Sequence, residues 1–282
     1  MSILVIGNEG NLSLYIGNIL KKRFSIKLVE IEKKSNLSKI LLRIDQKLNK
    51  FNFKYLVYLG GETRDQTQMK KVNDIFLIEI SKLCEKSKTS LIYLGSISVY
   101  GIPNNRVVNN KSDRKPFNLY GQTKNSADIY FMNRINKKIK IFNILPASII
   151  SNSKNNFYTK LRKFLKTQPA KISFSILCPG GQFNFCSYED ISNEIINAIN
   201  FSESLKENDQ SNQIYYYEKI ISKGIKIKDL FFESNNYYPY FVIPTLDLNL
   251  LRRFLFFVNP KILLRLIFLF SIIDYRNINS KF

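Results

Sequence analysis

Residues 3–13 read ILVIGNEGNLS, and this stretch decides the fold. Four consecutive apolar residues, 3–6, predict a strand buried on both faces, and the helical spacing that follows predicts a helix over 12–22. Gly7 and Gly10 lie in the turn between the two elements. Glycines in such a turn let the backbone approach a pyrophosphate at a helix N-terminus, where N–H groups are unpaired. The simpler alternative is that Gly10 serves only close packing of the helix.

The alternation of strand and helix continues to about residue 150. Predicted strands cover 3–6, 26–31, 55–59, 91–94 and 139–145, and predicted helices cover 12–22, 37–48, 69–84 and 120–133. The strands are apolar without strict alternation, as in a parallel sheet covered on both faces. The pattern therefore predicts an α/β fold with a doubly wound parallel sheet of the Rossmann type, and residues 1–150 as a dinucleotide-binding domain.

The pattern is less regular after residue 150. There we expect a smaller C-terminal substrate-binding subdomain over 151–282, with some segments returning to the Rossmann sheet. The predicted elements are helices over 157–167 and 191–201, a polar surface loop over 202–213, a strand over 215–217 that returns to the sheet, and amphipathic helices from Leu246 onwards that break at Pro260.

Composition narrows the classes of function. The 282 residues include 43 basic and 22 acidic side chains, which gives a net charge of +21. Such a charge attracts polyanions, although scattered surface lysines account for it equally well. The chain has no histidine, which excludes histidine-based acid/base catalysis and histidine-ligated metal. Its three cysteines are poorly spaced for a metal site, so we expect no metal.

The same features bear on location. Sparse cysteines and an N-terminus without a basic leader predict a cytoplasmic protein. The most apolar region, 248–273, is interrupted by arginines and by Pro260, so its longest uncharged stretch is far shorter than the roughly 20 residues that span a bilayer.

Two glutamates, Glu30 and Glu32, end the second predicted strand, about 20 residues beyond the glycines. A carboxylate at this distance accepts hydrogen bonds from ribose hydroxyls and repels a 2′-phosphate, and Glu30 has the better spacing. Lys33 and Lys34 follow directly and would instead tolerate a 2′-phosphate. NAD is therefore the expected cofactor, and NADP is the open alternative.

Tyr120 and Lys124 are four residues apart on a predicted helix and so share one face. A tyrosine is a poor base at neutral pH because its pKa is near 10, and a neighbouring ammonium group lowers that pKa. Ser96, at the end of the fourth predicted strand, can hold a substrate oxygen. Together they form an acid/base set that needs no histidine. In isolation, the Tyr/Lys spacing also arises often by chance.

These motifs together resemble the extended short-chain dehydrogenases/reductases, the NAD(P)-dependent epimerase/dehydratase group that acts on nucleotide sugars. The matching segments are Gly7–Gly10 of the glycine turn, 58–61 (YLGG), Asn73, 96–101 (SISVYG), Tyr120 with Lys124, 145–148 (LPAS), and 185–191 with Glu189 and Asp190. The order and spacing of the motifs are specific for that family over about residues 2–200.

The resemblance implies the roles of individual residues. The residues implied to bind the cofactor are Gly7, Gly10, Asn11, Leu12, Glu30, Leu59, Gly60, Gly61, Asn73, Tyr120, Lys124, Pro146 and Ser148. Ser96, Tyr120 and Lys124 are implied to be catalytic, and Ser96, Ser98 and Tyr120 to contact the substrate. The implied activity is epimerisation of a nucleotide sugar in surface polysaccharide synthesis by a homodimer. An NADPH-dependent keto-sugar reductase is the alternative, and the absence of an acid at Ile97 and Ser98 disfavours a dehydratase.

Several positions depart from the family pattern. Ser13 replaces the third glycine of the turn, Leu145 replaces an arginine, and Phe183 stands where sugar-nucleotide enzymes often carry an arginine. Asn109 and Asn110 occupy a region that usually holds an acid, and the chain ends early, at Phe282. These departures affect the expected substrate rather than the expected chemistry.

Two other readings stay open. The charge and the aromatic segment 215–240 would also suit a non-catalytic protein of this fold that binds a dinucleotide or RNA, although core packing explains the aromatics better, so nucleic acid is not the expected partner. The tail residues Leu250, Phe254, Phe257, Leu263, Leu266, Ile267 and Phe270 form apolar faces between arginines. Such a tail could lie on an anionic membrane, cap the substrate subdomain or contact a second subunit.

Overall fold

The computed structural model describes residues 1–8, 10–31, 36–103, 105–133, 139–150, 157–205, 216–243, 245 and 273–275. The predictions for Glu32, Lys33 and Lys34, for Tyr215, for 206–213 and for the tail over 246–272 lie outside these residues.

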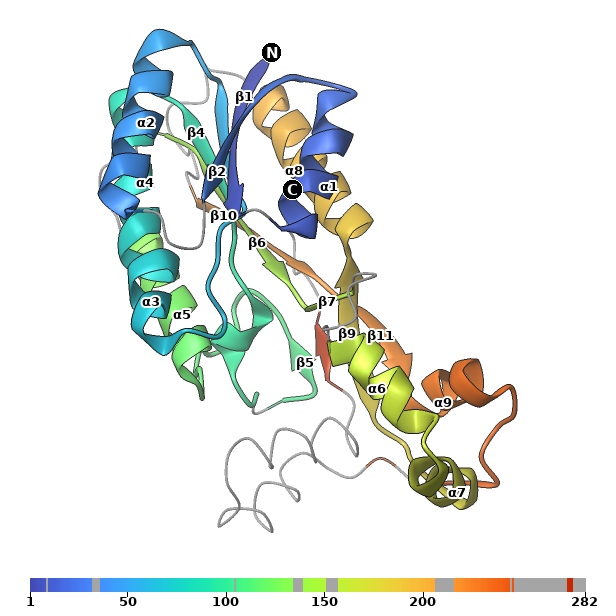
Figure 1. The fold of residues 1–282 in the computed structure, drawn as a ribbon. Helices are drawn as coiled ribbons and strands as arrows, with labels where there is room; N and C mark the ends of the chain where they lie inside the picture. The colour runs from blue at the N-terminus through green and yellow to red at the C-terminus, as the bar shows by residue number, and fades with distance from the viewer. Residues whose placement is uncertain are drawn as a thin grey trace.

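A six-stranded parallel sheet forms the centre of the molecule (Figure 1). Its strands in chain order are β1 (Ser2–Asn8), β2 (Ser25–Ile31), β3 (Tyr55–Tyr58), β4 (Ser90–Leu94), β6 (Ile141–Pro146) and β10 (Tyr216–Ile221). Their order across the sheet is β10-β6-β4-β3-β1-β2, and every neighbouring pair is parallel. The predicted doubly wound fold is confirmed.

Helices cover both faces of this sheet (Figure 1). One face carries α2 (Leu37–Lys50), α4 (Phe76–Lys86) and α5 (Leu119–Met132), and the other carries α1 (Asn11–Lys21) and α8 (Tyr188–Ser204). Alternate residues of a strand serve the two cores: in β1, Leu4 and Ile6 pack under the first set and Ile3 and Val5 under the second. Burial on both faces explains the unbroken apolar runs of the sequence.

The strand order places a switch point between β1 and β3. The chain passes from β1 outward to β2 and then crosses back to β3 on the other side of β1. The connections after β1 and β3 therefore lead to helices on opposite faces of the sheet, α1 and α4. Ligands of open α/β sheets bind at such a point.

Local capping fixes where several helices begin. The predicted helix over 69–84 starts earlier, at Gln66, because the Asp65 side chain accepts from the N–H groups of Thr67 and Gln68. It runs as α3 (Gln66–Lys70), a π-helical turn (Lys71–Ile75) and α4. Helix α8 starts three residues before the prediction, at a Ser187–Asp190 capping box, and it ends at Ser204. The predicted surface loop is thus wrong for residues 202–204.

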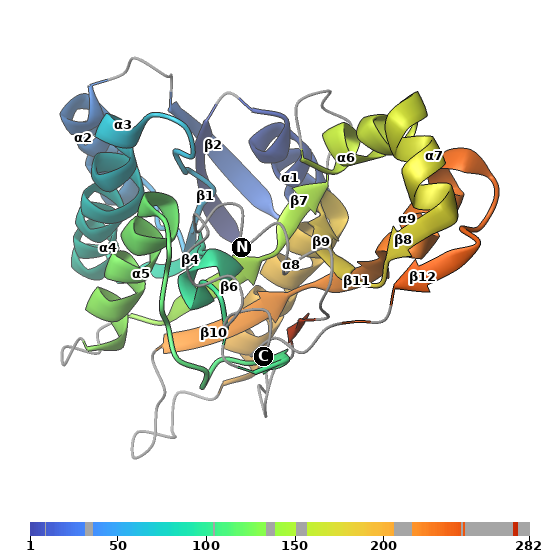
Figure 2. The same ribbon diagram turned by 90° about the horizontal axis from the view of Figure 1, so that it is seen from below.

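A smaller lobe lies beyond the carboxyl ends of the strands (Figure 2). It contains α6 (Phe157–Leu165), α7 (Gln168–Ile176), β8 (Leu177–Pro179), β11 (Lys223–Lys226), α9 (Ile227–Asn235) and β12 (Phe241–Ile243). Strands β7 (Ser148–Ile150) and β9 (Gln182–Ser187) join it to the main sheet in a three-stranded sheet of order β11-β9-β7. The two-residue strands β5 (Val107–Val108) and β13 (Asp274–Tyr275) pair with each other. Beyond residue 150, α8 packs on the main sheet and β10 is one of its strands. The domain boundary at residue 150 stays a prediction.

Candidate functional site

The turn after β1 has the features of an anion site. Gly10 is the N-cap of α1, and no side chain caps this helix. Its first turn carries no acid. The backbone N–H groups at the start of α1 therefore have no side-chain partner and point toward the turn. A methyl group on Gly7 would lie 2.1 Å from Ser13 Oγ, and Ser13 is buried. The missing side chain at Gly7 therefore makes room for Ser13, which keeps the helix close to the strand. Asn11 and Leu12 form the first turn of α1, and Asn11 is exposed.

The loop after β3 lies beside this turn. Leu59 is buried and its N–H donates to the Ile6 carbonyl at 2.7 Å, which extends the parallel pairing beyond β3. A side chain on Gly60 would collide with the Tyr58 ring at 2.6 Å. A Cβ on Gly61 would lie 3.6 Å from Lys124 Nζ and 3.7 Å from Asn73 Oδ1, so three predicted residues from separate segments meet here.

Asn73 holds the loop in place from the π-helical turn. Its side chain is fully buried; Oδ1 accepts from the Glu62 N–H at 2.8 Å, and Nδ2 donates to the Glu62 carbonyl at 2.8 Å. Nδ2 also donates to Thr123 Oγ1 at 3.2 Å, on the helix that carries Tyr120 and Lys124. Asn73 thus ties the glycine loop to α5.

Ser96 lies two residues after the end of β4 and caps the short 3₁₀ turn Ile97–Tyr100. The Ser98 hydroxyl and backbone N–H both donate to Ser96 Oγ, at 2.8 and 3.2 Å, and Ser98 is half-buried. A side chain on Gly121 would lie 2.7 Å from the Ser98 carbonyl oxygen, so this glycine lets α5 approach the serine segment closely. That close approach places Tyr120 beside Ser96.

The two titratable residues of α5 are in different environments. Tyr120 is half-buried; burial raises the pKa of its phenol, and a hydrogen bond with Ser96 acts in the opposite direction. Lys124 is buried and its Nζ donates to the Leu94 carbonyl at 2.8 Å. Burial lowers the pKa of Lys124 to about 8, partly offset by Asp128. The predicted lowering of the Tyr120 pKa by Lys124 stays a prediction.

Glu30, Pro146 and Ser148 complete the predicted set. Glu30 pairs with Gly7 at the carboxyl end of β2. Pro146 is buried at the end of β6, and Ser148 is exposed at the start of β7. Phe183, which stands at the position where an arginine is expected, is 3% exposed and packs with Cys178 and Ile227.

A buried ionic network behind the site is absent from the predictions. Arg114 Nη1 donates to Asp128 Oδ2 at 2.6 Å, and its other terminal nitrogen pairs with Glu218 on β10. Tyr93 donates to Asp128 at 2.7 Å, and Tyr100 donates to Glu218 at 2.9 Å. The network therefore links α5 to β4, to the serine segment and to the edge strand.

Charges in this region balance. The side chains of Arg114, Asp128 and Glu218 are at most 10% exposed, and Asp128 stands one helical turn after Lys124. Burial alone would lower the pKa of Arg114, but the two carboxylates outweigh it and raise that pKa. Two cations and two carboxylates thus share one buried region, which fixes α5 against the sheet.

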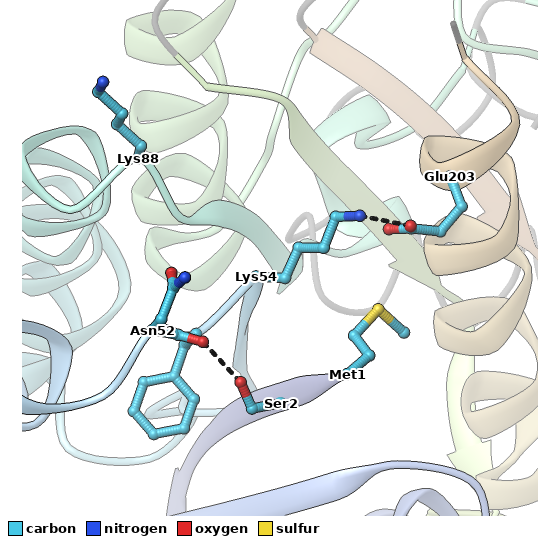
Figure 3. A pocket seen from close by; sticks show the side chains of 7 residues that line it. Met1, Ser2, Asn52, Lys54, Lys88 and Glu203 are labelled. Atoms are coloured by element: carbon cyan, nitrogen blue, oxygen red, sulfur yellow. Dashed lines mark hydrogen bonds and ion pairs between the residues drawn. The ribbon is translucent and has the colours of Figure 1, made fainter. Parts of the chain in front are cut away.

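A hollow of about 500 Å³ lies at the opposite, amino-terminal edge of the sheet (Figure 3). Its side chains come from Met1, Ser2, Asn52, Phe53, Lys54, Lys88 and Glu203. Lys54 contacts Glu203 at 2.5 Å, with side chains 59% and 36% exposed, and such exposed pairs contribute little. The predicted site residues lie at the other edge, so the hollow is not part of the site.

The described residues include no group of three or more acidic or cysteine side chains arranged to hold a metal ion. Cys84, Cys178 and Cys186 are buried and unpaired. Within the described part of the chain, no helix is both long and apolar enough to cross a membrane.

Comparison with solved structures establishes the fold. The enzyme WbmG of Bordetella bronchiseptica, solved with NAD, superposes with a TM-score of 0.62 at 15% identity, over 88% of this chain and 82% of that chain. ADP-L-glycero-D-manno-heptose-6-epimerase of Helicobacter pylori gives 0.62 at 15% identity, over 86% and 84%. A dTDP-4-dehydrorhamnose reductase of Clostridium acetobutylicum gives 0.63 at 14% identity, over 99% and 90%. The chain has the fold of the extended short-chain dehydrogenases/reductases.

No protein-family model and no curated protein sequence matches the chain. At 14–15% identity, structural likeness carries the fold and not the activity. The function must therefore be argued from the residues of the site.

Proposed function

We propose that this protein is an NAD(P)-dependent enzyme that oxidises and reduces a hydroxyl-bearing carbon of a nucleotide sugar. The observation that carries the proposal is the convergence at one edge of the sheet: Tyr120 beside Ser96, with Lys124 within 4 Å of the Cβ position of Gly61. The solved structures with the same fold include one with NAD and one with NAD and UDP, which supports both ligand classes.

The turns after β1 and β3 suit the cofactor. The uncapped N-terminus of α1 supplies N–H groups and a positive dipole end for a pyrophosphate, and Gly7 and Gly10 allow the backbone to approach it. Glu30 at the end of β2 is the residue for the ribose hydroxyls, which favours NAD over NADP. A bound nicotinamide would accept the hydride from the substrate carbon and return it.

Tyr120 and Lys124 of α5, together with Ser96 just after β4, carry out the proton transfer. Ser96 Oγ holds the reacting oxygen of the substrate, and Tyr120 takes the proton from that hydroxyl or returns it. Because burial raises the pKa of Tyr120, a nearby positive charge is needed for it to act as a base. Lys124 can supply that charge, since its pKa of about 8 leaves most of the ammonium protonated at neutral pH.

The net reaction that we propose is epimerisation, in which the carbon gives up its hydride and takes it back on the other face. Reduction of a keto sugar is the second candidate, because a reductase superposes as well as an epimerase does. Neither Ile97 nor Ser98 is an acid, which disfavours dehydration. Homodimer formation and contact of the tail with a membrane stay predictions.

Native mass spectrometry of the purified protein separates these candidates. Epimerisation is supported if the purified protein retains NAD and then converts a nucleotide sugar to its epimer without net change in the cofactor. Exchangeable NADPH that is consumed with a keto sugar supports reduction. A protein that binds no dinucleotide but binds RNA in a salt-sensitive manner would overturn the proposal.

A further inference from the structure

The small lobe lies at the end of the molecule away from α2 (Figure 2). Several of its apolar and aromatic side chains are exposed. The most exposed of these are Tyr240 at 83%, Phe241 at 67%, Ile172 at 58%, Tyr238 at 57% and Ile176 at 55%. Isolated exposed apolar residues are ordinary, but a contiguous group of this kind marks an interaction surface.

Backbone contacts join the two segments that carry these residues. The Tyr240 N–H donates to the Ser175 carbonyl of α7 at 2.7 Å, and Phe241 pairs with Leu177 where β12 runs along β8. The exposed residues of α7 and of the chain over 238–242 therefore lie on neighbouring segments of the small lobe, and we call them together the aromatic patch: Ile172, Ile176, Tyr238, Tyr240, Phe241 and Val242.

The charge beside the patch is mainly positive. The segment 157–176, which comprises α6, α7 and the turn between them, contains five basic residues and no acid. Lys163 and Lys166 are exposed, and Lys171 Nζ lies 5.8 Å from the Tyr237 ring centroid at the rim of the patch. The acids of this lobe, Asp229 and Glu233, lie on α9.

We propose that the aromatic patch and the lysines of α6 and α7 form a docking surface for an anionic lipid bilayer. Tyrosines with an apolar body and a polar tip belong at the depth of lipid headgroups, and phenylalanine and isoleucine insert beneath them. Lysines at the rim contact anionic headgroups, and each one strengthens binding about fivefold. A second copy of the chain that docked through the same face would bring two basic surfaces together, which their charge opposes.

Vesicle flotation of the full chain tests the proposal. We expect the protein to float with phosphatidylserine-containing vesicles, to stay unbound with pure phosphatidylcholine, and to be released by high salt. Lys163→Gln/Lys166→Gln/Lys171→Gln should weaken partitioning roughly a hundredfold. Tyr240→Ser/Phe241→Ser should weaken it more than tenfold.

A matched control removes the same charge at the far end of the molecule: Lys39→Gln/Arg43→Gln/Lys50→Gln on α2 should lose far less partitioning. Thermal melting confirms that each variant folds, and the lysine variants change only surface side chains. Absence of binding to anionic vesicles would overturn the proposal. Equal losses in the α2 control, full binding by both patch variants, or conversion of a dimer to monomers by Tyr240→Ser/Phe241→Ser without lipid would also overturn it.

Discussion

Lys124 gives the site a pH signature that can be measured without knowing the substrate. Burial lowers the pKa of its ammonium to about 8 in the folded chain, whereas in the unfolded chain that pKa returns to about 10.4. Between these two pH values the unfolded chain binds more protons than the folded chain. The free energy of unfolding contributed by this residue therefore rises with pH through that window.

The magnitude follows from the difference between the two pKa values. It corresponds to about 3 kcal/mol, most of it gained between about pH 7 and about pH 10. The side chain is 2% exposed, so solvent screening reduces this figure little. In Lys124→Met the titration is absent, and the variant should not share the rise.

The assay is urea unfolding of the wild type and Lys124→Met across that pH range. We expect the free energy of unfolding of the wild type to rise by about 2 to 3 kcal/mol relative to the variant. Lys39→Met, at an exposed position on α2, should follow the wild type. Parallel pH profiles for the wild type and Lys124→Met would refute the reasoning, because they would mean that folding does not lower the pKa of Lys124.

Three further changes test other parts of the site. Arg114→Met leaves two buried carboxylates without their partner and should lower the free energy of unfolding by about 3 to 5 kcal/mol. The control Arg64→Met, at an exposed position, should lower it by less than about 0.5 kcal/mol. Equal losses of the two variants in urea unfolding would contradict the buried network. Gly121→Ala meets the Ser98 carbonyl oxygen at 2.7 Å and should cost about 1 to 3 kcal/mol by the same assay, so a neutral result would show that α5 is not packed this closely. Asn73→Ala releases the loop after β3 and should raise the Kd for NADH about tenfold in a fluorescence titration, which an unchanged Kd would rule out.

The sheet and its helices could be predicted because their signals are local. An apolar run followed by a glycine turn and a helical repeat predicts one βα unit without reference to the rest of the chain. The same holds for the spacing of Tyr120 and Lys124 on one helical face. The structure adds the reason that Ser13 is tolerated: its side chain occupies the space that the missing side chain of Gly7 leaves free.

The ionic network could not be predicted in the same way. Arg114, Asp128 and Glu218 come from a loop, a helix and an edge strand, and no periodicity connects them. One signal was available, since Asp128 stands four residues after Lys124 and would be buried on the same face. The small lobe was also predicted poorly, because its short elements depend on contacts such as β12 with β8 rather than on long periodic patterns.

Hydride transfer in Tyr120→Phe tests the central claim most directly. In a single turnover with the nucleotide sugar that the wild type converts, the wild type should show transient reduction of bound NAD in the nicotinamide absorbance. Tyr120→Phe should still bind NADH, and the rate of that transient should fall by about a hundredfold or more. A variant that keeps the wild-type rate would contradict the assignment of Tyr120 as the acid/base group.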